Sequence, residues 1–283
     1  MGRVFGLLVG LVVLSLIFLV IERLSPHIKG QPVLRKGFWT DVIYWFFTPL
    51  VTKVLTGAAM ILPFLGLVLL AGVTAEQLKV HQYTGFGPLS RQPMWLQGVE
   101  LFLLGDFLGY WSHRFFHTGR WWRIHAVHHS SQQLDWLSSV RVHPLNDVVT
   151  KLAQVIPILL LGFNPDTVLK IFAPVLTFYA IFLHANVDWT YGPFRAVIAS
   201  PVFHRWHHTS ELEGRDKNFA GFFPFWDILF GTYYMPEGKL PREFGIDEPM
   251  PENILGQLAF PFRKAESTPA PPPAIPQAEP VGK

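Results

Sequence analysis

The stretch VFGLLVGLVVLSLIFLVI, residues 4–21, decides the class of fold to which this chain belongs. It contains no charged side chain, and its length is that of an apolar helix able to cross the hydrocarbon core of a bilayer. The alternative is a cleaved signal peptide, whose apolar part is normally shorter and ends in small residues. Here the run ends in Ile21, Glu22 and Arg23, so we interpret it as an uncleaved membrane anchor.

Four later segments carry the same signal. Residues 54–73, 95–111, 148–162 and 167–183 are apolar runs that we predict to be further membrane spans. The aromatic segment 38–50 is interrupted by an aspartate and a proline, so it is either interfacial or the entry to a span. In the second case, the region from residue 38 onward could hold a hairpin in place of one span.

The composition of the whole chain agrees with a membrane protein. Half of the 283 residues are hydrophobic, and only 15% are charged, against roughly 25% in a soluble domain. We therefore predict an all-α fold, a polytopic membrane helical bundle with a histidine-rich helical cap on the cytoplasmic side.

The distribution of basic residues predicts the orientation. With five spans, most of the 23 lysines and arginines fall on the side opposite the N-terminus, and that side is expected to be cytoplasmic. We expect a multi-pass protein of a bacterial inner membrane, or of the endoplasmic reticulum membrane if the source is eukaryotic. Three regions are expected: N-terminal spans and loops (1–94), a histidine-rich domain (95–262) and a disordered tail rich in proline and alanine (263–283).

Composition also excludes several kinds of chemistry. The chain has no cysteine, which rules out disulfides, thiolate metal ligands and thiol nucleophiles. Its net charge of +3 is small, so we expect no nucleic-acid partner.

Histidines are numerous, and most of them fall into short motifs. His113 and His117 form HxxxH, and HxxHH occurs twice, at 125–129 and 204–208. Residues three and four apart share one face of a helix, so each motif directs its imidazoles together. Neutral imidazole is a good ligand for zinc, copper, iron and nickel. The eight motif histidines together with His184 are too many for one ion and suit two.

These motifs, with their neighbours, resemble the fatty acid hydroxylase and sterol desaturase superfamily of membrane di-iron oxidases. The likeness runs from about residue 105 to residue 233. It rests on DFLGYWSHRFFH (106–117), WRIHAVHH (122–129), RVHP (141–144), FLHANV (182–187), HRWHHT (204–209) and FWDILFGTY (225–233).

The resemblance implies four or five spanning helices, two iron ions held by nine or ten histidines, and O2 as co-substrate. Zinc could replace iron in purified protein, because its intrinsic affinity for such ligands exceeds that of ferrous iron. The metal-ligand candidates carried over are His113, His117, His125, His128, His129, His143, His184, His204, His207 and His208. His143 is also a candidate for a structural role, because Pro144 follows it.

Asp106 is a carboxylate inside a predicted span, where charge is costly and usually has a functional partner. It lies two helical turns before His113, so we predict that it accepts a hydrogen bond from an imidazole N–H of the metal site. A helix–helix hydrogen bond, for example to Tyr110, is the alternative.

The predicted function is hydroxylation or desaturation of a membrane lipid, such as a sterol or a fatty acyl chain, with O2. A zinc-dependent membrane hydrolase is the alternative, although HExxH is absent and nine histidines exceed the three ligands that it needs. A metal transporter would instead carry its ligands within the spans.

Either oxidase reaction requires electrons that this chain cannot collect from a nicotinamide by itself. It has no cysteine for an iron–sulfur cluster and no GxGxxG turn for a flavin or dinucleotide. We therefore expect an external donor, a ferredoxin or a cytochrome b5 with its reductase. The basic residues Arg120, Arg123, Arg205 and Arg215 are expected to help it dock.

Overall fold

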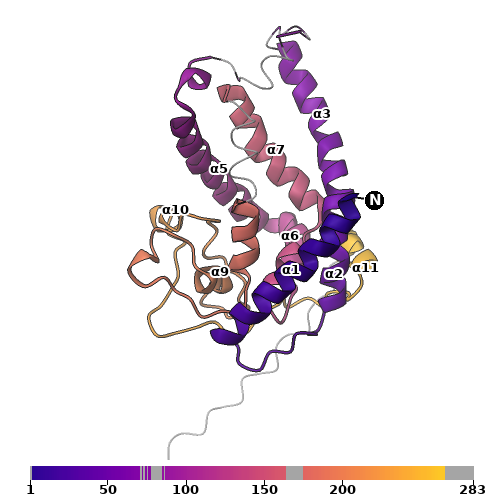
Figure 1. Cartoon of the computed structure of the whole chain (residues 1–283), viewed down its shortest axis with the longest axis vertical. Coiled ribbons are helices and arrows are strands. Elements are labelled where there is room, and N and C mark those ends of the chain that lie inside the picture. Colours follow the sequence, from indigo (N-terminus) through magenta and orange to yellow (C-terminus); the bar gives the residue numbers. More distant parts are fainter. Residues whose placement is uncertain are drawn as a thin grey trace, which may run out of the picture.

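The computed structural model describes residues 2–70, 72, 74, 76–77, 85, 87–163 and 175–264. Within these ranges the chain is all-helical, with no strand and two isolated bridges, Pro26 to Val187 and Thr209 to Phe244 (Figure 1). The predicted all-α class is confirmed. Most of the predicted tail, much of the loop at 74–94 and the first half of the predicted span 167–183 lie outside the described residues.

The first apolar run forms helix α1, Gly2–Leu24, as predicted. Most of its residues are exposed, several are half-buried, and Phe18 is the one that is fully buried. The ring of Phe18 stacks on Trp136 with centroids 5.3 Å apart, which fixes the second half of α1 against the histidine-rich part of the chain. A helix that is apolar on every side is stable only where lipid or protein surrounds it.

The region from residue 38 to residue 70 follows one helical path and does not form a hairpin. Helix α2, Phe38–Phe47, passes through the π-helical segment η1, Thr48–Thr52, into helix α3, Lys53–Leu70. Its backbone hydrogen bonds continue through both junctions, from Thr48 N–H to Tyr44 O and from Lys53 N–H to Thr48 O. The segment 38–50 is therefore the first part of a long helix, which the sequence-based prediction had divided into two segments.

Two helical stretches among the described residues are long and apolar enough to cross a membrane, Gly2–Leu24 and Phe38–Pro63. They indicate a membrane-associated protein. The predicted spans 95–111 and 148–162 lie in α5, Met94–Phe116, and α7, Pro144–Leu161. In Figure 1, α7 lies between α3 and α5, and it packs against both.

The remaining helices are short and lie near the lower ends of α3, α5 and α7 in Figure 1, beside α1; together we call residues 117–143 and 184–264 the cap. Its helices are α6, Trp122–His129; α9, Pro201–His207; α10, Phe225–Leu229; and α11, Ile254–Ala259. The 3-10 turns are η2, Leu89–Arg91, outside the cap, and within it η3, Gly119–Trp121; η4, Trp136–Val140; η5, Gly192–Phe194; and η6, Phe260–Phe262. Residues 175–183 are also helical and lead into the cap.

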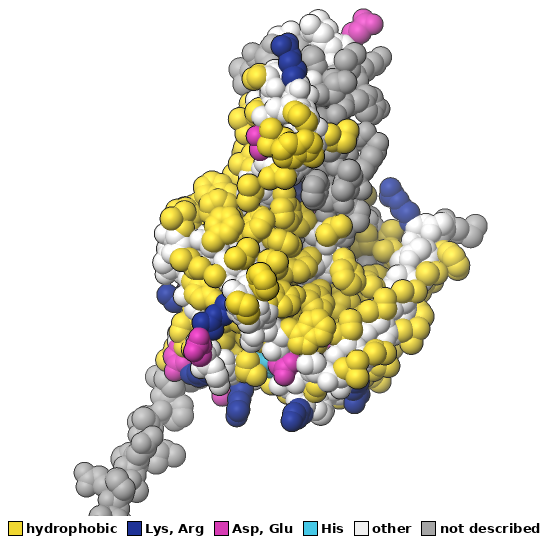
Figure 2. Space-filling view, turned by 60° about the vertical axis from the view of Figure 1, so that its left-hand side comes forward, with side chains coloured by type: hydrophobic (Ala, Val, Ile, Leu, Met, Phe, Trp, Pro, Cys, Tyr) yellow, Lys and Arg dark blue, Asp and Glu magenta, His cyan; other side chains and the backbone are white. Residues whose placement is uncertain are grey.

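Apolar packing joins the cap to the lower end of α5. Tyr110 of α5, Phe203 and Trp206 of α9, and Phe219 are all buried in one cluster. On the face shown in Figure 2, hydrophobic side chains cover most of the surface, and Lys and Arg side chains gather at the lower end. This pattern suits a molecule whose lower end meets water.

Candidate metal centre

Three helices carry the histidine motifs: α5, which ends where the cap begins, and α6 and α9, which lie within the cap. His113 lies in the last turn of α5, and His117 caps its end. Gly119, with a left-handed φ of 49°, turns the chain into α6, which carries HxxHH. Helix α9 starts at Ser200, whose side chain accepts a hydrogen bond from Phe203 N–H, and it carries the second HxxHH.

Five histidines form the first group, cluster A: His113, His117, His125, His129 and His207. One nitrogen from each of them lies within 4.8 Å of all the others. His113 Nε2 and His125 Nε2 lie 3.0 Å apart. The side chain of His117 is only 4% exposed, so even the outermost of the five is shielded from water.

Four histidines form the second group, cluster B: His128, His184, His204 and His208. Their Nε2 atoms lie in a chain, with His128 3.2 Å from His184, His184 3.2 Å from His204, and His204 3.1 Å from His208. All four side chains are buried.

Each HxxHH motif contributes to both groups. On α6, His125 and His129 belong to cluster A, and His128 belongs to cluster B. At the end of α9, His207 belongs to cluster A, while His204 and His208 belong to cluster B. The groups therefore lie side by side, and the imidazoles of His129 and His208 stack with centroids 4.3 Å apart.

The outer nitrogen of most of these rings is tied to a fixed acceptor. Six of the nine use Nδ1 in this way. Examples are His128 Nδ1 to Arg141 O at 3.1 Å and His184 Nδ1 to Ala180 O at 2.8 Å. A carbonyl oxygen only accepts, so the proton of these neutral imidazoles is on Nδ1, and the lone pair on Nε2 faces its cluster.

Converging lone pairs repel each other unless a cation lies among them. Within the described part of the chain, the buried Nε2 atoms of His117, His129 and His207 have no hydrogen-bond partner. Burial lowers the pKa of all six histidines on α6 and at the end of α9 well below the usual value, so these rings are neutral near pH 7. Neutral, preoriented imidazoles with free lone pairs are the donor set that a divalent transition metal requires.

Comparison with known proteins shows that the same region matches a protein family. Residues 98–232, which include all nine clustered histidines, match the fatty acid hydroxylase family model. The chain contains a fatty acid hydroxylase domain. The resemblance first seen in the motifs is thereby confirmed, and the domain places the chain among the oxidoreductases.

The relatives are enzymes whose names specify a lipid substrate. Over 249 residues the chain is 28% identical to the ornithine lipid hydroxylase OlsE of Rhizobium tropici, covering 88% of this chain and 73% of that protein. It is 31% identical over 150 residues to human alkylglycerol monooxygenase, covering 53% of this chain and 33% of that protein. It is 30% identical over 154 residues to the C-4 methylsterol oxidase erg25 of Schizosaccharomyces pombe, with 52% and 49% covered. No solved structure matches significantly.

His143, the tenth ligand candidate, lies outside both clusters. Its Nε2 donates to Leu258 O at 3.1 Å, and its Nδ1 accepts from Leu145 N–H at 3.2 Å. With both nitrogens engaged, His143 joins the start of α7 to α11. The structural role suggested by Pro144 is the one that this geometry favours, and the alternative that His143 binds metal stays a prediction without support from the two clusters.

Asp106 also has a different partner from the one predicted. Its two carboxylate oxygens accept the backbone N–H groups of Phe222 and Phe223, at 2.8 and 2.9 Å. The carboxylate therefore supports a loop of the hydroxylase domain and does not bind an imidazole in the structure. The spacing of Asp106 from His113 placed the two on one face of α5, but a sequence gives no sign of which distant backbone amides approach that face.

The arginines expected on a docking surface are mostly engaged elsewhere. Arg205 is fully buried, and its Nη1 donates to backbone carbonyls, those of Leu134 and His184 among them. Arg123 pairs with Glu248 at 2.6 Å, and Arg215 pairs with Asp247 at 2.8 Å. Only Arg120 remains exposed without a carboxylate partner among the described residues. Burial removes Arg205 from any docking surface, and a docking role for the other three arginines stays a prediction.

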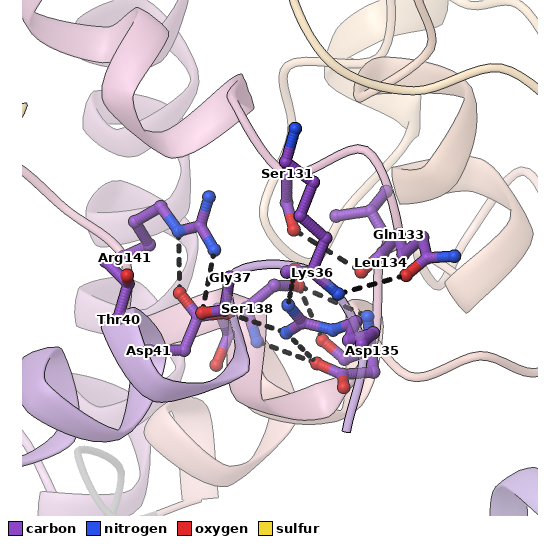
Figure 3. A network of polar contacts seen from close by, with 12 residues as sticks. Lys36, Gly37, Thr40, Asp41, Ser131, Gln133, Leu134, Asp135, Ser138 and Arg141 are labelled. Carbon is purple, nitrogen blue, oxygen red and sulfur yellow. Dashed lines mark hydrogen bonds and ion pairs between the residues drawn. The ribbon is translucent and has the colours of Figure 1, made fainter. Parts of the chain in front are cut away.

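A buried ion network that the sequence did not reveal holds the loop after α6 against α2 (Figure 3). Asp41 accepts from Arg141 Nε at 2.6 Å and from Arg35 Nη2 at 2.7 Å. Arg35 also pairs with Asp135, which caps η4. This network fixes Arg141, whose carbonyl oxygen accepts a hydrogen bond from His128 of cluster B. The four charged residues of the network are therefore connected to cluster B through Arg141.

A cavity of about 400 Å³ opens beside cluster A. His117, His129 and His207 form part of its wall, and ion-paired residues such as Asp216 and Asp247 line its rim. It connects cluster A with the polar surface of the cap.

Proposed function

We propose that this chain is a membrane-bound non-haem di-iron oxidase that hydroxylates a lipid, using O2 and electrons from an external donor. The supporting observation is the division of nine buried histidines into two neighbouring groups of five and four within the hydroxylase domain. The number of groups matches the two ions that the motifs predict, and each group has more nitrogen donors than the three protein ligands of a catalytic zinc site. The observation therefore favours an oxidase over the hydrolase alternative.

The side chains have separable tasks in this proposal. Nine imidazoles hold the metals, and acceptors such as Asn146 Oδ1, 2.8 Å from His125 Nδ1, fix their orientation. Burial excludes water from the ligands and keeps them neutral. Two iron ions bound there would supply the activation of O2 that attack on an unactivated C–H bond requires.

The substrate class comes from the relatives. They are named as an ornithine lipid hydroxylase, an alkylglycerol monooxygenase and a methylsterol oxidase. We propose a membrane lipid as substrate and hydroxylation as the reaction, with desaturation as the competing outcome. Mass spectrometry of lipids from cells with and without the gene tests this. A species heavier by one oxygen supports hydroxylation, and a species lighter by two hydrogens supports desaturation. The absence of any gene-dependent lipid would contradict both.

We further propose a multi-pass arrangement with the cap on the cytoplasmic side. Its support is the collection of Lys and Arg at the lower end of the molecule, next to the cap (Figure 2), and the two apolar helical stretches that lead away from that end. This arrangement would give the metal centre access to lipid from one side and to soluble carriers from the other.

The electron donor is proposed to be a ferredoxin or a cytochrome b5 with its reductase. The chain has no cysteine and no dinucleotide-binding turn. The test is turnover by iron-loaded protein in detergent with lipid, O2 and NADPH, with and without an added reductase chain. Sustained product without any carrier would contradict the proposal.

A further inference from the structure

Three of the five histidines in cluster A have their outer nitrogens fixed by one short segment of the chain. His117 Nδ1 lies 2.8 Å from Asp216 Oδ1, His207 Nδ1 lies 2.8 Å from Lys217 O, and His113 Nδ1 lies 2.8 Å from Phe219 O. The three imidazoles come from two different helix ends, α5 and α9, but their acceptors come from four consecutive residues. We call residues 216–219 the positioning segment.

The backbone of the positioning segment has an unusual conformation. Asp216 has φ of 54° and Asn218 has φ of 58°, and among the described non-glycine residues only Tyr191 shares a positive φ. Left-handed backbone is disfavoured for residues with a Cβ atom, and Asn and Asp tolerate it best. Asp216 and Asn218 have one residue between them, and each turns the chain sharply. These two turns allow neighbouring residues to present their oxygens to three separate rings. Strain of this kind persists where surrounding contacts impose it, often at functional sites.

Asn218 supplies those contacts. Its side chain is fully buried, and its Nδ2 donates to Phe203 O at 2.9 Å and to Tyr234 O at 2.7 Å. Its Oδ1 accepts from Tyr234 N–H at 2.7 Å, and its own N–H donates to Thr232 O at 2.9 Å. Asn218 thus ties the segment to α9 and to the chain that follows α10.

Two carboxylates hold the residues that come next. Asp227 of α10 accepts from Phe219 N–H at 2.7 Å and from Ala220 N–H at 2.9 Å. Asp106 of α5 accepts from Phe222 and Phe223 N–H. The positioning segment is therefore fixed to α9 and α10, the residues that follow it are fixed to α5, and α5 and α9 also carry the ligands that the segment orients.

We infer that the positioning segment sets the orientation and the proton location of three cluster A imidazoles and of none in cluster B, with Asp216 and Asn218 as positioning residues. The inference rests on the proposed metal centre. In cluster B, the outer nitrogens of His128 and His184 use other acceptors, Arg141 O and Ala180 O, and those of His204 and His208 have no hydrogen-bond partner among the described residues. Loss of a positioning residue should therefore weaken one metal site and leave the other intact. Outer partners of this kind are typically worth about 10–100-fold in metal affinity.

The test uses Co²⁺ titration of the metal-free full chain in detergent, followed by absorption of the bound ion. His113→Ala and His184→Ala identify the binding step that belongs to each cluster. Asp216→Gly removes the carboxylate and suits the left-handed backbone, while Asp216→Asn keeps an acceptor oxygen. We expect D216G to weaken the cluster A step by about 10–100-fold and D216N to restore most of the loss.

Two further variants complete the design. Asn218→Gly keeps the backbone conformation but removes the side-chain anchors, so it should weaken the cluster A step at least as much as D216G. Asp247→Ala is the matched control, because it removes a carboxylate from the same cavity rim, and that carboxylate binds only Arg215 among the described residues. Both steps should be unchanged in D247A.

The inference is overturned if D216G leaves the cluster A step unchanged, or if it weakens both steps equally. Retention of the cluster B step shows that the variant is folded. If the unaltered chain takes up no Co²⁺ at all, the metal centre itself is wrong, and this result is distinct from a failure of the positioning segment.

Discussion

A buried imidazole binds a metal through a nitrogen that carries no proton, so it can be a ligand only where that nitrogen does not already accept a hydrogen bond. His125 and His143 illustrate the difference. His125 Nδ1 lies 2.8 Å from Asn146 Oδ1, and its Nε2 faces His113. Both nitrogens of His143 are engaged by the backbone, so no lone pair remains for a metal. Residue type is the same at the two positions, and only the surroundings separate a ligand from a structural group.

This difference gives a prediction for two single variants. His143→Ala should keep the full metal content and lose about 1–3 kcal/mol of stability, because Leu145 N–H and Leu258 O lose their partner. His125→Ala should lose metal and activity. Elemental analysis and thermal unfolding of the two purified variants give the comparison. An H143A protein depleted of metal to the same extent as H125A would show that His143 is a ligand.

Spacing within the sequence predicted which histidines converge, because HxxxH and HxxHH have meaning on any helix. It could not predict the acceptors behind them. Lys217 O and Phe219 O are backbone atoms, which every residue possesses, and Asp216 is one of many charged residues on the surface. The assignment of His128 and His129 to different groups was also beyond the sequence, since it depends on how α6 and α9 face each other.

At the scale of elements, the connection between α2 and the loop after α6 rests on ion pairs that are buried. Arg35, Asp41 and Arg141 are almost completely inaccessible. Removal of one member of such a network leaves an uncompensated buried charge. The same network fixes the residue that orients His128, so stability and cluster B are linked through it.

Asp41→Ala should therefore destabilise the protein by about 3–5 kcal/mol and lower the metal content of cluster B. The matched control is Glu237→Ala, which breaks the exposed pair with Arg195 and should cost about 0–1 kcal/mol. Thermal unfolding in one detergent, with metal analysis of the folded fraction, provides both readouts. Equal stability of D41A and E237A would contradict this account.

The long helix from residue 38 to residue 70 shows why the ends of helices could not be predicted from the sequence. Asp41 and Pro49 were interpreted as interruptions of an apolar helix. In the structure Asp41 is neutralised by two arginines, and Pro49 lies inside the continuous helical path, within η1, where it removes one backbone hydrogen bond without ending the helix. A π-helical segment then carries the chain into α3 without a break.

At the scale of the whole molecule, the proposed orientation can be tested with single cysteines, because the chain has none of its own. Lys29→Cys and Leu212→Cys lie on exposed parts of the cap side, and Arg91→Cys lies near the opposite end of the long helices. A membrane-impermeant maleimide should label R91C in intact cells and label K29C and L212C only after the cells are opened. Labelling of L212C in intact cells would place the cap on the wrong side.

The central claim is that the nine histidines form two neighbouring metal sites, and the iron content of anaerobically purified protein tests it most directly. The account predicts close to two iron ions per chain in the unaltered protein, and about one in each of the variants His113→Ala and His184→Ala, whose lost ligands belong to different clusters. A chain that binds a single iron, or that loses all metal in both variants, would contradict it.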